Sequence, residues 1–309
     1  MRIAVYGAGG VGGYFGGRLA QAGEDVVFIA RGGTLKALQE TGLRVDSISG
    51  DFSVQPVQAS DDLESIGTVD AVLVSVKSWQ IAGIVNNLQP LIGPDTVVVP
   101  LLNGVEAPAQ IAEVLGAEHV LGGLCGLLSF VVEPGHIRHV GADPFLTFGE
   151  MDNQVTDRVN KLRDAFADTI GVKAVVPADI QVAMWTKFLL IASWSGVGAI
   201  TRVPVGSFLS VPQCRELLTG AMREIYDVAH ARGVALPEDI VGNTLNFMDG
   251  LPPTGTASMQ RDIMEGRHSE LDSQTGAVVR LGEEAGVETP INKYIYSSLL
   301  PQELKARDG

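Results

Sequence analysis

The first half of the chain alternates short runs of β-branched and aliphatic residues with amphipathic stretches. The runs have the continuous apolar character of strands buried on both faces, and the stretches repeat apolar positions with the period of a helix. This alternation predicts a doubly wound parallel sheet, and therefore the α/β class. The predicted strands are 3–6, 25–30, 71–76 and 96–100, and the predicted helices are 14–21, 35–41, 79–88 and 107–114.

One further segment has the pattern of an antiparallel hairpin, and another continues in strand-like pieces. Residues 43–57 are interrupted by Ser49-Gly50-Asp51, which predicts a hairpin inserted into the parallel pattern. Residues 121–149 continue as strand-like pieces with a turn at Glu133-Pro134-Gly135. We therefore expect more sheet in this half than the parallel strands alone provide.

The pattern changes after Pro177, where strand signals almost vanish and apolar positions recur with helical spacing. Asp179 is placed to cap a helix through Ser193, and further helices are predicted at 213–232, 237–248 and 256–285. We predict two domains, an α/β domain over 1–177 and an all-helical domain over 178–309.

The first predicted strand runs directly into the GxGxxG sequence of residues 7–12. In such a loop Gly7 permits the tight turn, Gly9 admits a pyrophosphate to the backbone, and Gly12 lets the following helix pack closely. A structural glycine turn is the alternative, but the position between a strand and a helix favours a Rossmann-type dinucleotide-binding domain. Of the 37 glycines, those in 7–17 are accordingly interpreted as phosphate-approach positions.

The end of the second predicted strand favours NADP(H) as the cofactor. NAD-binding domains place a carboxylate about 20 residues beyond the glycine loop to hold the ribose hydroxyl. This strand ends instead in Ala30-Arg31-Gly32, and the planar guanidinium of Arg31 is suited to grip a 2'-phosphate. A solvated loop arginine is the alternative.

Lys187 and Asn103 are candidates for the chemistry. Lys187 is the only charge in 182–192, and an ammonium near apolar walls donates its proton more readily at neutral pH. The alternative is a lysine that extends to solvent. Asn103 follows the strand 96–100, where ligands of open α/β sheets bind, although an Asn-Gly turn explains it equally well.

The predicted helix 256–285 contributes further polar candidates. Ser258 and Asp262 lie one turn apart and share a face, and Glu270 lies further along. Charged residues on a long helix are usually solvated, so these positions carry little weight by themselves.

The composition limits the classes of binding partner and the cellular compartment that we expect for this protein. With 22 Lys and Arg against 36 Asp and Glu, the formal net charge is -14, which disfavours nucleic acid as a partner. The isolated Cys125 and Cys214 indicate neither a disulfide framework nor a metal site, and favour a reducing compartment. The uncharged stretches are shorter than a bilayer requires and the N-terminus lacks a signal-peptide pattern, so we expect a cytoplasmic protein with no membrane partner.

In their order and spacing, these motifs resemble the ketopantoate reductase family, within the 6-phosphogluconate dehydrogenase-like superfamily. The likeness covers nearly the whole chain and rests on the glycine loop, Arg31, 74–80, 103–104, 185–187 and 256–272, with Ser258 and Glu270 twelve positions apart. It implies reduction of the 2-oxo acid ketopantoate to pantoate by hydride transfer from NADPH, which is 2-dehydropantoate 2-reductase activity, and a homodimer through the C-terminal helices.

The resemblance also implies residue roles. Lys77 would contact the cofactor, and Asn103 would lie near the nicotinamide ribose and the substrate. Lys187 would be the general acid that protonates the new hydroxyl oxygen, and Glu270 would orient the lysine and the substrate. Ser258 would hydrogen-bond the substrate, with Ser195 at a further substrate-facing position.

Three positions depart from the family pattern. The family's asparagines four and eight residues after the lysine are replaced by Ile191 and Ser195, and a third asparagine before Ser258 is replaced by Gly255. Losing these amides removes expected partners of the substrate. A ketopantoate reductase, a reductase of a different and more apolar 2-oxo acid, and a non-catalytic NADP(H)-binding protein therefore all stay open.

Overall fold

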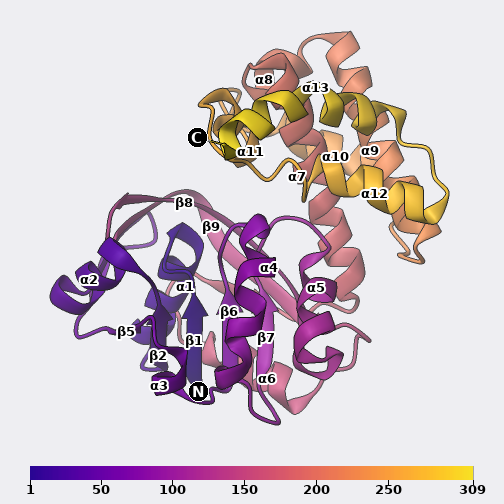
Figure 1. Cartoon of the computed structure of the whole chain (residues 1–309). Coiled ribbons are helices and arrows are strands. Elements are labelled where there is room, and N and C mark those ends of the chain that lie inside the picture. The colour runs from indigo at the N-terminus through magenta and orange to yellow at the C-terminus, as the bar shows by residue number, and fades with distance from the viewer. Residues whose placement is uncertain (309) are drawn as a thin grey trace. The chain divides into compact units, whose positions relative to one another are not determined.

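The computed structural model describes residues 1–308, which divide into two compact units (Figure 1). The first unit contains Met1–Leu102 and Ala107–Ile180, and the second contains Asn103–Glu106 and the chain from Gln181 onward. The main break thus lies three residues beyond the predicted boundary at 177. The sequence did not anticipate that Asn103–Glu106 packs with the helical unit.

The core of the first unit is a parallel five-stranded sheet in the order β5-β2-β1-β6-β7, as the doubly wound pattern predicted. Side chains alternate along β1, since Ile3 and Val5 enter one hydrophobic core while Ala4 and Tyr6 enter another. Burial on both faces explains the continuous apolar runs in the sequence. The strands are β1 Arg2–Tyr6, β2 Asp25–Ile29, β5 Gln58–Ser60, β6 Ala71–Val74 and β7 Val97–Pro100.

The predicted hairpin of 43–57 and the strand-like pieces of 121–149 join into a second sheet of the same unit. β3 pairs antiparallel with β4, which confirms the predicted hairpin. β8 pairs antiparallel with β9, which confirms strands on both sides of the predicted turn at Pro134-Gly135. β3 also pairs in parallel with β9, a contact between distant segments that no local pattern shows. The strands are β3 Leu43–Ser47, β4 Phe52–Val54, β8 Leu121–Glu133, β9 His136–Glu150 and β10 Lys173–Val175.

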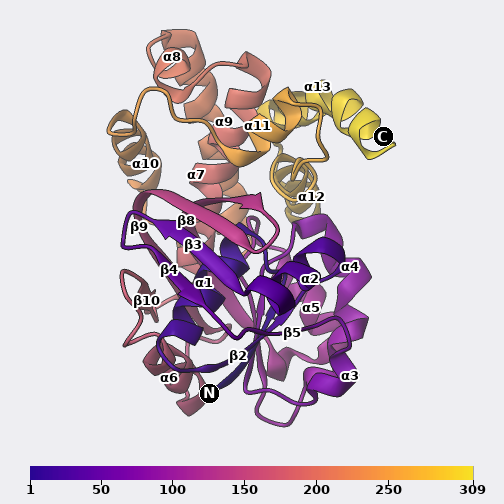
Figure 2. The ribbon, with the colours of Figure 1, turned by 90° about the vertical axis from the view of Figure 1, so that its left-hand side faces the viewer.

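Helix α1 (Gly10–Gln21) lies between the two sheets (Figure 2). A Cβ on Gly16 would lie 2.7 Å from the ring of Phe28 in the first sheet. A Cβ on Gly13 would lie 2.0 Å from Ile137 in the second sheet. The prediction that the glycines of 7–17 serve phosphate approach is therefore wrong for Gly13 and Gly16, which let one helix fit between two sheets.

The remaining helices of the first unit cover the sheet and its ends. α4 and α5 pack on the face opposite α1 (Figure 1). The single helix predicted at 79–88 is instead an α-helical turn between two 3₁₀ segments, since Gly83 and Pro90 both weaken a continuous α-helix. The helices are α2 Gly32–Thr41, α3 Leu63–Ile66, η1 Ser78–Gln80, α4 Ile81–Ile84, η2 Val85–Leu91, α5 Ala107–Leu115, η3 Ala117–His119 and α6 Asp157–Ala165.

The second unit is helical and has its own hydrophobic core. Its first helix is apolar around most of its circumference and long enough to cross a bilayer, but 61% of its most apolar window is buried, as in the core helix of a globular unit. It also extends eight residues beyond the predicted end at Ser193. The helices are α7 Ile180–Thr201, α8 Val205–Leu209, α9 Pro212–Ala231, α10 Ile240–Asp249, α11 Ser258–Met264, α12 Thr275–Ala285 and α13 Pro290–Arg307.

The continuous helix predicted over 256–285 does not exist. Helix α11 ends at Met264, shortly before Gly266, which has a φ of +69° that favours glycine. Residues 265–274 are irregular, and α12 begins only at Thr275. Ser258 is therefore the first residue of a short helix, whereas Glu270 lies in the irregular segment.

Candidate functional site

The glycine loop closes tightly onto the carboxyl edge of the parallel sheet. Gly7 follows β1 with a φ of +98°, and a Cβ there would lie 2.9 Å from the carbonyl oxygen of Ser75. A Cβ on Gly12 would lie 2.1 Å from the carbonyl oxygen of Gly7. At both positions a neighbouring carbonyl oxygen leaves no room for a Cβ, so only glycine fits.

Gly9 differs from its neighbours because a Cβ there would meet nothing within 4 Å. It is the N-cap of α1, so the unpaired amides of the first helical turn begin here. Open space in front of a helix N-terminus, reached through a residue without a side chain, fits the pyrophosphate of a dinucleotide.

Two buried hydroxyl groups without hydrogen-bond partners lie against this loop. The Oγ of Ser75 is one, directly after β6, and the Oγ of Ser129 in β8 is the other. Ser129 Oγ would lie only 2.7 Å from a Cβ on Gly10. Such unpaired donors fit a ligand rich in acceptor oxygens. The sequence placed Ser75 inside the predicted strand 71–76, whereas the structure ends β6 at Val74 and leaves Ser75 at the loop. The sheet pairing brings Ser129 to the same loop.

Arg31 and Lys77 follow β2 and β6, the two strands on either side of β1, at the same edge of the sheet. Arg31 is exposed, and its guanidinium donates to the Tyr6 hydroxyl at 3.3 Å. The half-buried Lys77 carries its Nζ 5.6 Å from the centre of the Trp79 ring. The structure therefore gathers the predicted cofactor residues Gly7, Gly9, Gly12, Arg31 and Lys77 at one edge of one sheet.

In the second unit, Asn103 and Glu270 are hydrogen-bonded although they are 167 positions apart. The Asn103 Nδ2 atom donates to Glu270 Oε2 at 3.0 Å, and Gln274 Nε2 approaches the same oxygen at 3.4 Å. The Glu270 side chain is only 4% exposed, so these amides compensate for a carboxylate withdrawn from water. Gln274 is a site residue that the sequence did not single out.

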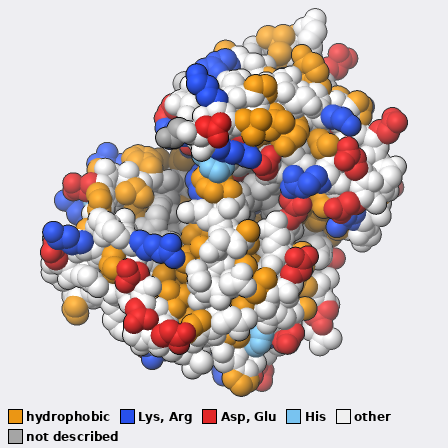
Figure 3. Space-filling model, in the orientation of Figure 1, with side chains coloured by type: hydrophobic (Ala, Val, Ile, Leu, Met, Phe, Trp, Pro, Cys, Tyr) orange, Lys and Arg blue, Asp and Glu red, His pale blue; other side chains and the backbone are white. Residues whose placement is uncertain are grey.

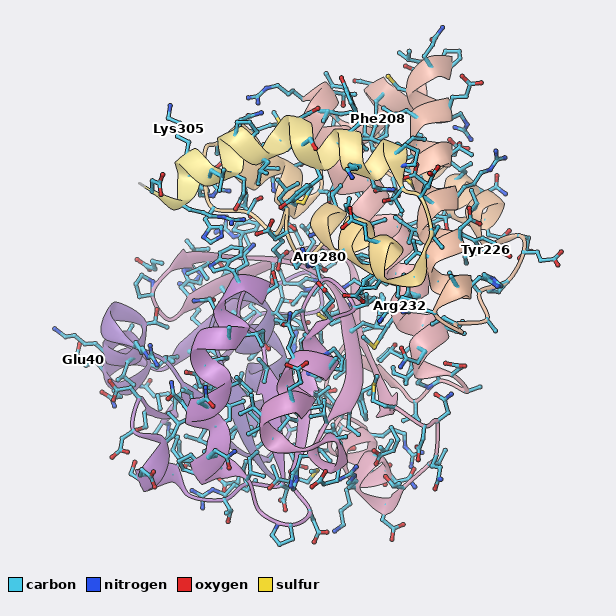
Figure 4. All side chains as sticks on the ribbon, turned by 45° about the vertical axis from the view of Figure 1, so that its right-hand side comes forward. Glu40, Phe208, Tyr226, Arg232, Arg280 and Lys305 are labelled. Carbon is cyan, nitrogen blue, oxygen red and sulfur yellow. The ribbon has the colours of Figure 1, made fainter. Side chains whose placement is uncertain are left out.

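The segment carrying Asn103 is attached to the helical unit at its other end as well. Glu106 forms an ion pair with Arg280 of α12 at 2.7 Å, and Val105 packs against the helical core. Arg280, labelled in Figure 4, also donates to the carbonyl oxygen of Asp272. These contacts explain why Asn103–Glu106 leaves the first unit.

Lys187, Ile191 and Ser195 follow one another at intervals of four along α7 and share a face. Lys187 and Ile191 are half-buried, whereas Ser195 is fully buried and its Oγ has no hydrogen-bond partner. Ser258, also half-buried, begins α11. Its neighbour Asp262 is bound by Arg267 at 2.7 Å.

Among residues 1–308, no group of three or more His, Cys, Asp or Glu side chains is arranged to hold a metal ion.

Comparison with known proteins covers both units. Residues 3–153 match the family model described as ketopantoate reductase PanE/ApbA, and residues 179–303 match the model for the C terminal part of the same family. The chain belongs to the ketopantoate reductase family. It is therefore an oxidoreductase of a family of dinucleotide-binding reductases.

Individual relatives match over nearly their whole length. An uncharacterized oxidoreductase, YkpB of Bacillus subtilis (strain 168), is 31% identical over 97% of this chain and 98% of its own. A 2-dehydropantoate 2-reductase of Nostoc sp. is 29% identical over 96% and 94%. The crystal structure of 2-dehydropantoate 2-reductase from Geobacter metallireducens GS-15 has a TM-score of 0.89 and 31% identity, covering 98% of this chain and 99% of that one.

Proposed function

We propose that this protein is an NADPH-dependent reductase that converts a 2-oxo acid to a 2-hydroxy acid, with ketopantoate as the first substrate to test. The observation that carries the proposal is the hydrogen bond between Asn103 and the buried carboxylate of Glu270. Neither residue is needed to build the dinucleotide loop, so their pairing supports a reaction site rather than a cofactor site alone.

The first unit supplies residues that suit a bound NADPH. The open backbone at Gly9 and the N-terminus of α1 would receive the pyrophosphate, and Arg31 would receive the 2'-phosphate. Lys77, at the same edge, would add a positive charge. When bound, the cofactor supplies the hydride that reduces the 2-oxo carbon.

The second unit supplies residues that suit the proton transfer. Hydride addition leaves negative charge on the former carbonyl oxygen, and the ammonium of Lys187 would stabilise that charge and donate a proton from Nζ. Glu270 would orient the lysine and the substrate, while Ser258 would hydrogen-bond the substrate end. The unpartnered Ser195 hydroxyl is a further donor available to a ligand or a water.

A second candidate substrate class is favoured by Ile191. This half-buried apolar side chain lies one turn after Lys187, where family members carry an amide. A substrate hydroxyl facing isoleucine would lose a hydrogen bond, which strongly penalises binding. A 2-oxo acid without the 4-hydroxyl of ketopantoate would avoid that penalty.

Oxidation of NADPH by the purified protein, measured with a panel of 2-oxo acids, tests these proposals together. We expect turnover with ketopantoate or with a more apolar 2-oxo acid. Lys187→Ala should lower kcat by about 10²- to 10⁴-fold while leaving the Kd for NADPH unchanged. Lys293→Ala, on the exposed side of α13, is the control and should keep full activity.

Three results would change the assignment. Full turnover by Lys187→Ala would refute its role as the general acid. A markedly better substrate lacking the 4-hydroxyl would replace ketopantoate. Tight NADPH binding without turnover on any 2-oxo acid would instead indicate a non-catalytic binding protein.

A further inference from the structure

A buried carboxylate of helix α13, that of Glu303, binds the irregular segment that carries Glu270. The Glu303 side chain is 0% exposed. It accepts hydrogen bonds from the Ser269 backbone amide at 3.1 Å and from the Ser269 hydroxyl. Ser269 is the residue immediately before Glu270, so this contact holds the backbone from which the Glu270 side chain departs.

The environment of Glu303 compensates for its burial. Arg307, one turn further along α13, donates to Glu303 Oε1 at 3.1 Å, and His268 Nε2 lies 3.3 Å from the same oxygen. A buried carboxylate is retained only when its oxygens are well supplied with donors. Here the Ser269 amide, the Ser269 hydroxyl and the His268 ring all belong to residues 268 and 269, so most of the compensation comes from the segment itself.

The same helix holds the segment on the other side of Glu270. Asp272 accepts hydrogen bonds from the Tyr296 hydroxyl at 2.7 Å and from Arg307. Arg307 thus bridges Glu303 and Asp272. Glu270 lies between two anchored residues in a segment that has no regular secondary structure to fix it.

We infer that Glu303 is a positioning residue for Glu270. Its carboxylate fixes Ser269, and this sets the direction in which the Glu270 carboxylate meets Asn103 and the substrate. The inference rests on the proposed function, because it assigns a catalytic consequence to a contact outside the reaction site. Displacement of a catalytic group by about 1 Å can cost about 100-fold in rate, so a loosened segment has a measurable effect.

Glu224 of α9 offers a matched control, because its carboxylate binds the other end of α13. Glu224 is a buried carboxylate that accepts from the backbone amides of Ile291 and Asn292 at 2.7 and 2.9 Å, near the N-terminus of α13. At 1.5 Å per residue, this contact lies about 18 Å along the helix from Glu303. Glu303→Ala and Glu224→Ala therefore remove similar hydrogen bonds from opposite ends of one helix.

Both alanine variants should lower the Tm, because each leaves buried donors unpaired. Only Glu303→Ala should lower kcat, by about tenfold or more, with the Kd for NADPH unchanged. Glu303→Gln, which retains an acceptor for Ser269, should recover part of the kcat. Hydrogen exchange followed by mass spectrometry should show faster exchange over 267–273 in Glu303→Ala and not in Glu224→Ala.

An equal loss of kcat in both alanine variants would overturn the inference, since it would reveal a general effect of destabilisation. Unchanged exchange over 267–273 in Glu303→Ala would overturn it as well. If the parent protein turns over no 2-oxo acid, the proposed function fails, and the catalytic consequence assigned to Glu303 falls with it. Faster exchange in Glu303→Ala alone would then still establish the anchoring contact.

Discussion

At the scale of single residues, Arg31 is held in place before any ligand arrives. Its guanidinium donates to the hydroxyl of Tyr6, a residue at the end of the neighbouring strand β1 that is 5% exposed. The remaining guanidinium hydrogens are on an exposed side chain at the carboxyl edge of the sheet. An arginine oriented in this way loses less entropy when it binds a phosphate.

Arg31→Ala should therefore separate the two nicotinamide cofactors. Loss of a charge-assisted contact worth about 1.5 to 3 kcal/mol should raise the KM for NADPH by about 10- to 100-fold. The KM for NADH, which lacks the 2'-phosphate, should change little. The measurement is steady-state kinetics with each cofactor, and Arg44→Ala, at an exposed arginine of β3, is the control. Equal losses with both cofactors would refute the 2'-phosphate role.

At the scale of elements, the sequence of α1 is constrained by close contacts on two sides. Gly12 and Gly16 face the parallel sheet, while Gly13 and Gly17 face the second sheet. A helix with such a small cross-section approaches both sheets closely. Two-sided packing explains why glycine persists in α1 despite its cost of about 1 kcal/mol per residue in a helix interior.

Gly16→Ala should destabilise the protein by about 1 to 3 kcal/mol, because the new methyl group would meet Val5 and Phe28 in a packed core. Gly83→Ala is the matched control, since a Cβ on this exposed helical glycine meets nothing within 4 Å. It should leave stability unchanged or raise it slightly, because alanine favours the helix. Chemical denaturation of both variants measures the difference. Similar destabilisation by both substitutions would contradict the packing argument.

The boundaries of α11 and α12 differ from those that the local sequence pattern predicts. The sequence favoured one helix over 256–285 because its apolar positions keep a helical period on both sides of the break. Gly266 was a visible stop signal, but only the contacts of Ser269 and Asp272 with α13 stabilise the irregular stretch that follows. The segment in which the chain is no longer helical is therefore the segment that carries Glu270.

At the scale of the whole molecule, the formal net charge is -14. On the face shown in Figure 3, acidic and basic side chains are interspersed. Several carboxylates are held by cationic partners, as Asp249 is by Arg215. The Arg215 hydrogen bond lowers the pKa of Asp249 below its usual value. Acid should weaken the fold by protonating carboxylates of this kind.

Asp272 should contribute to this acid sensitivity. Burial opposes its ionisation, but hydrogen bonds from Tyr296 and Arg307 outweigh burial and hold the pKa of this carboxyl below its usual 3.8. A lowered folded-state pKa stabilises the fold above the unfolded-state pKa, and this stabilisation is lost as the pH falls through the folded-state value. Asp272→Asn should therefore lower the Tm at pH 7, and the difference from the parent should shrink below about pH 4.

Thermal unfolding at pH 7 and at pH 3 measures this difference. Asp168→Asn, at an exposed aspartate, is the control and should match the parent at both values. A difference for Asp272→Asn that stays constant between the two pH values would show that its hydrogen bonds do not depend on the charge of the carboxylate.

The sequence alone determined the features that depend on near neighbours. Apolar runs and glycine spacing predicted four of the five parallel strands, the hairpin of 43–57, the loop at Gly7 and the helical second half. Strands, turns and helices are selected by residues a few positions apart. The family resemblance added expected roles for the candidates Lys187 and Glu270, and the family models that match both units support the resemblance.

Only the tertiary structure decided what depends on distant residues. It paired β3 with β9, placed α1 between two sheets, and moved Asn103–Glu106 to the helical unit. It also surrounded Glu270 with Asn103, Gln274 and the anchor formed by Glu303. Hydrogen bonds across 34 and 167 positions leave no periodic trace in a sequence, because their partners meet only after the intervening chain has folded.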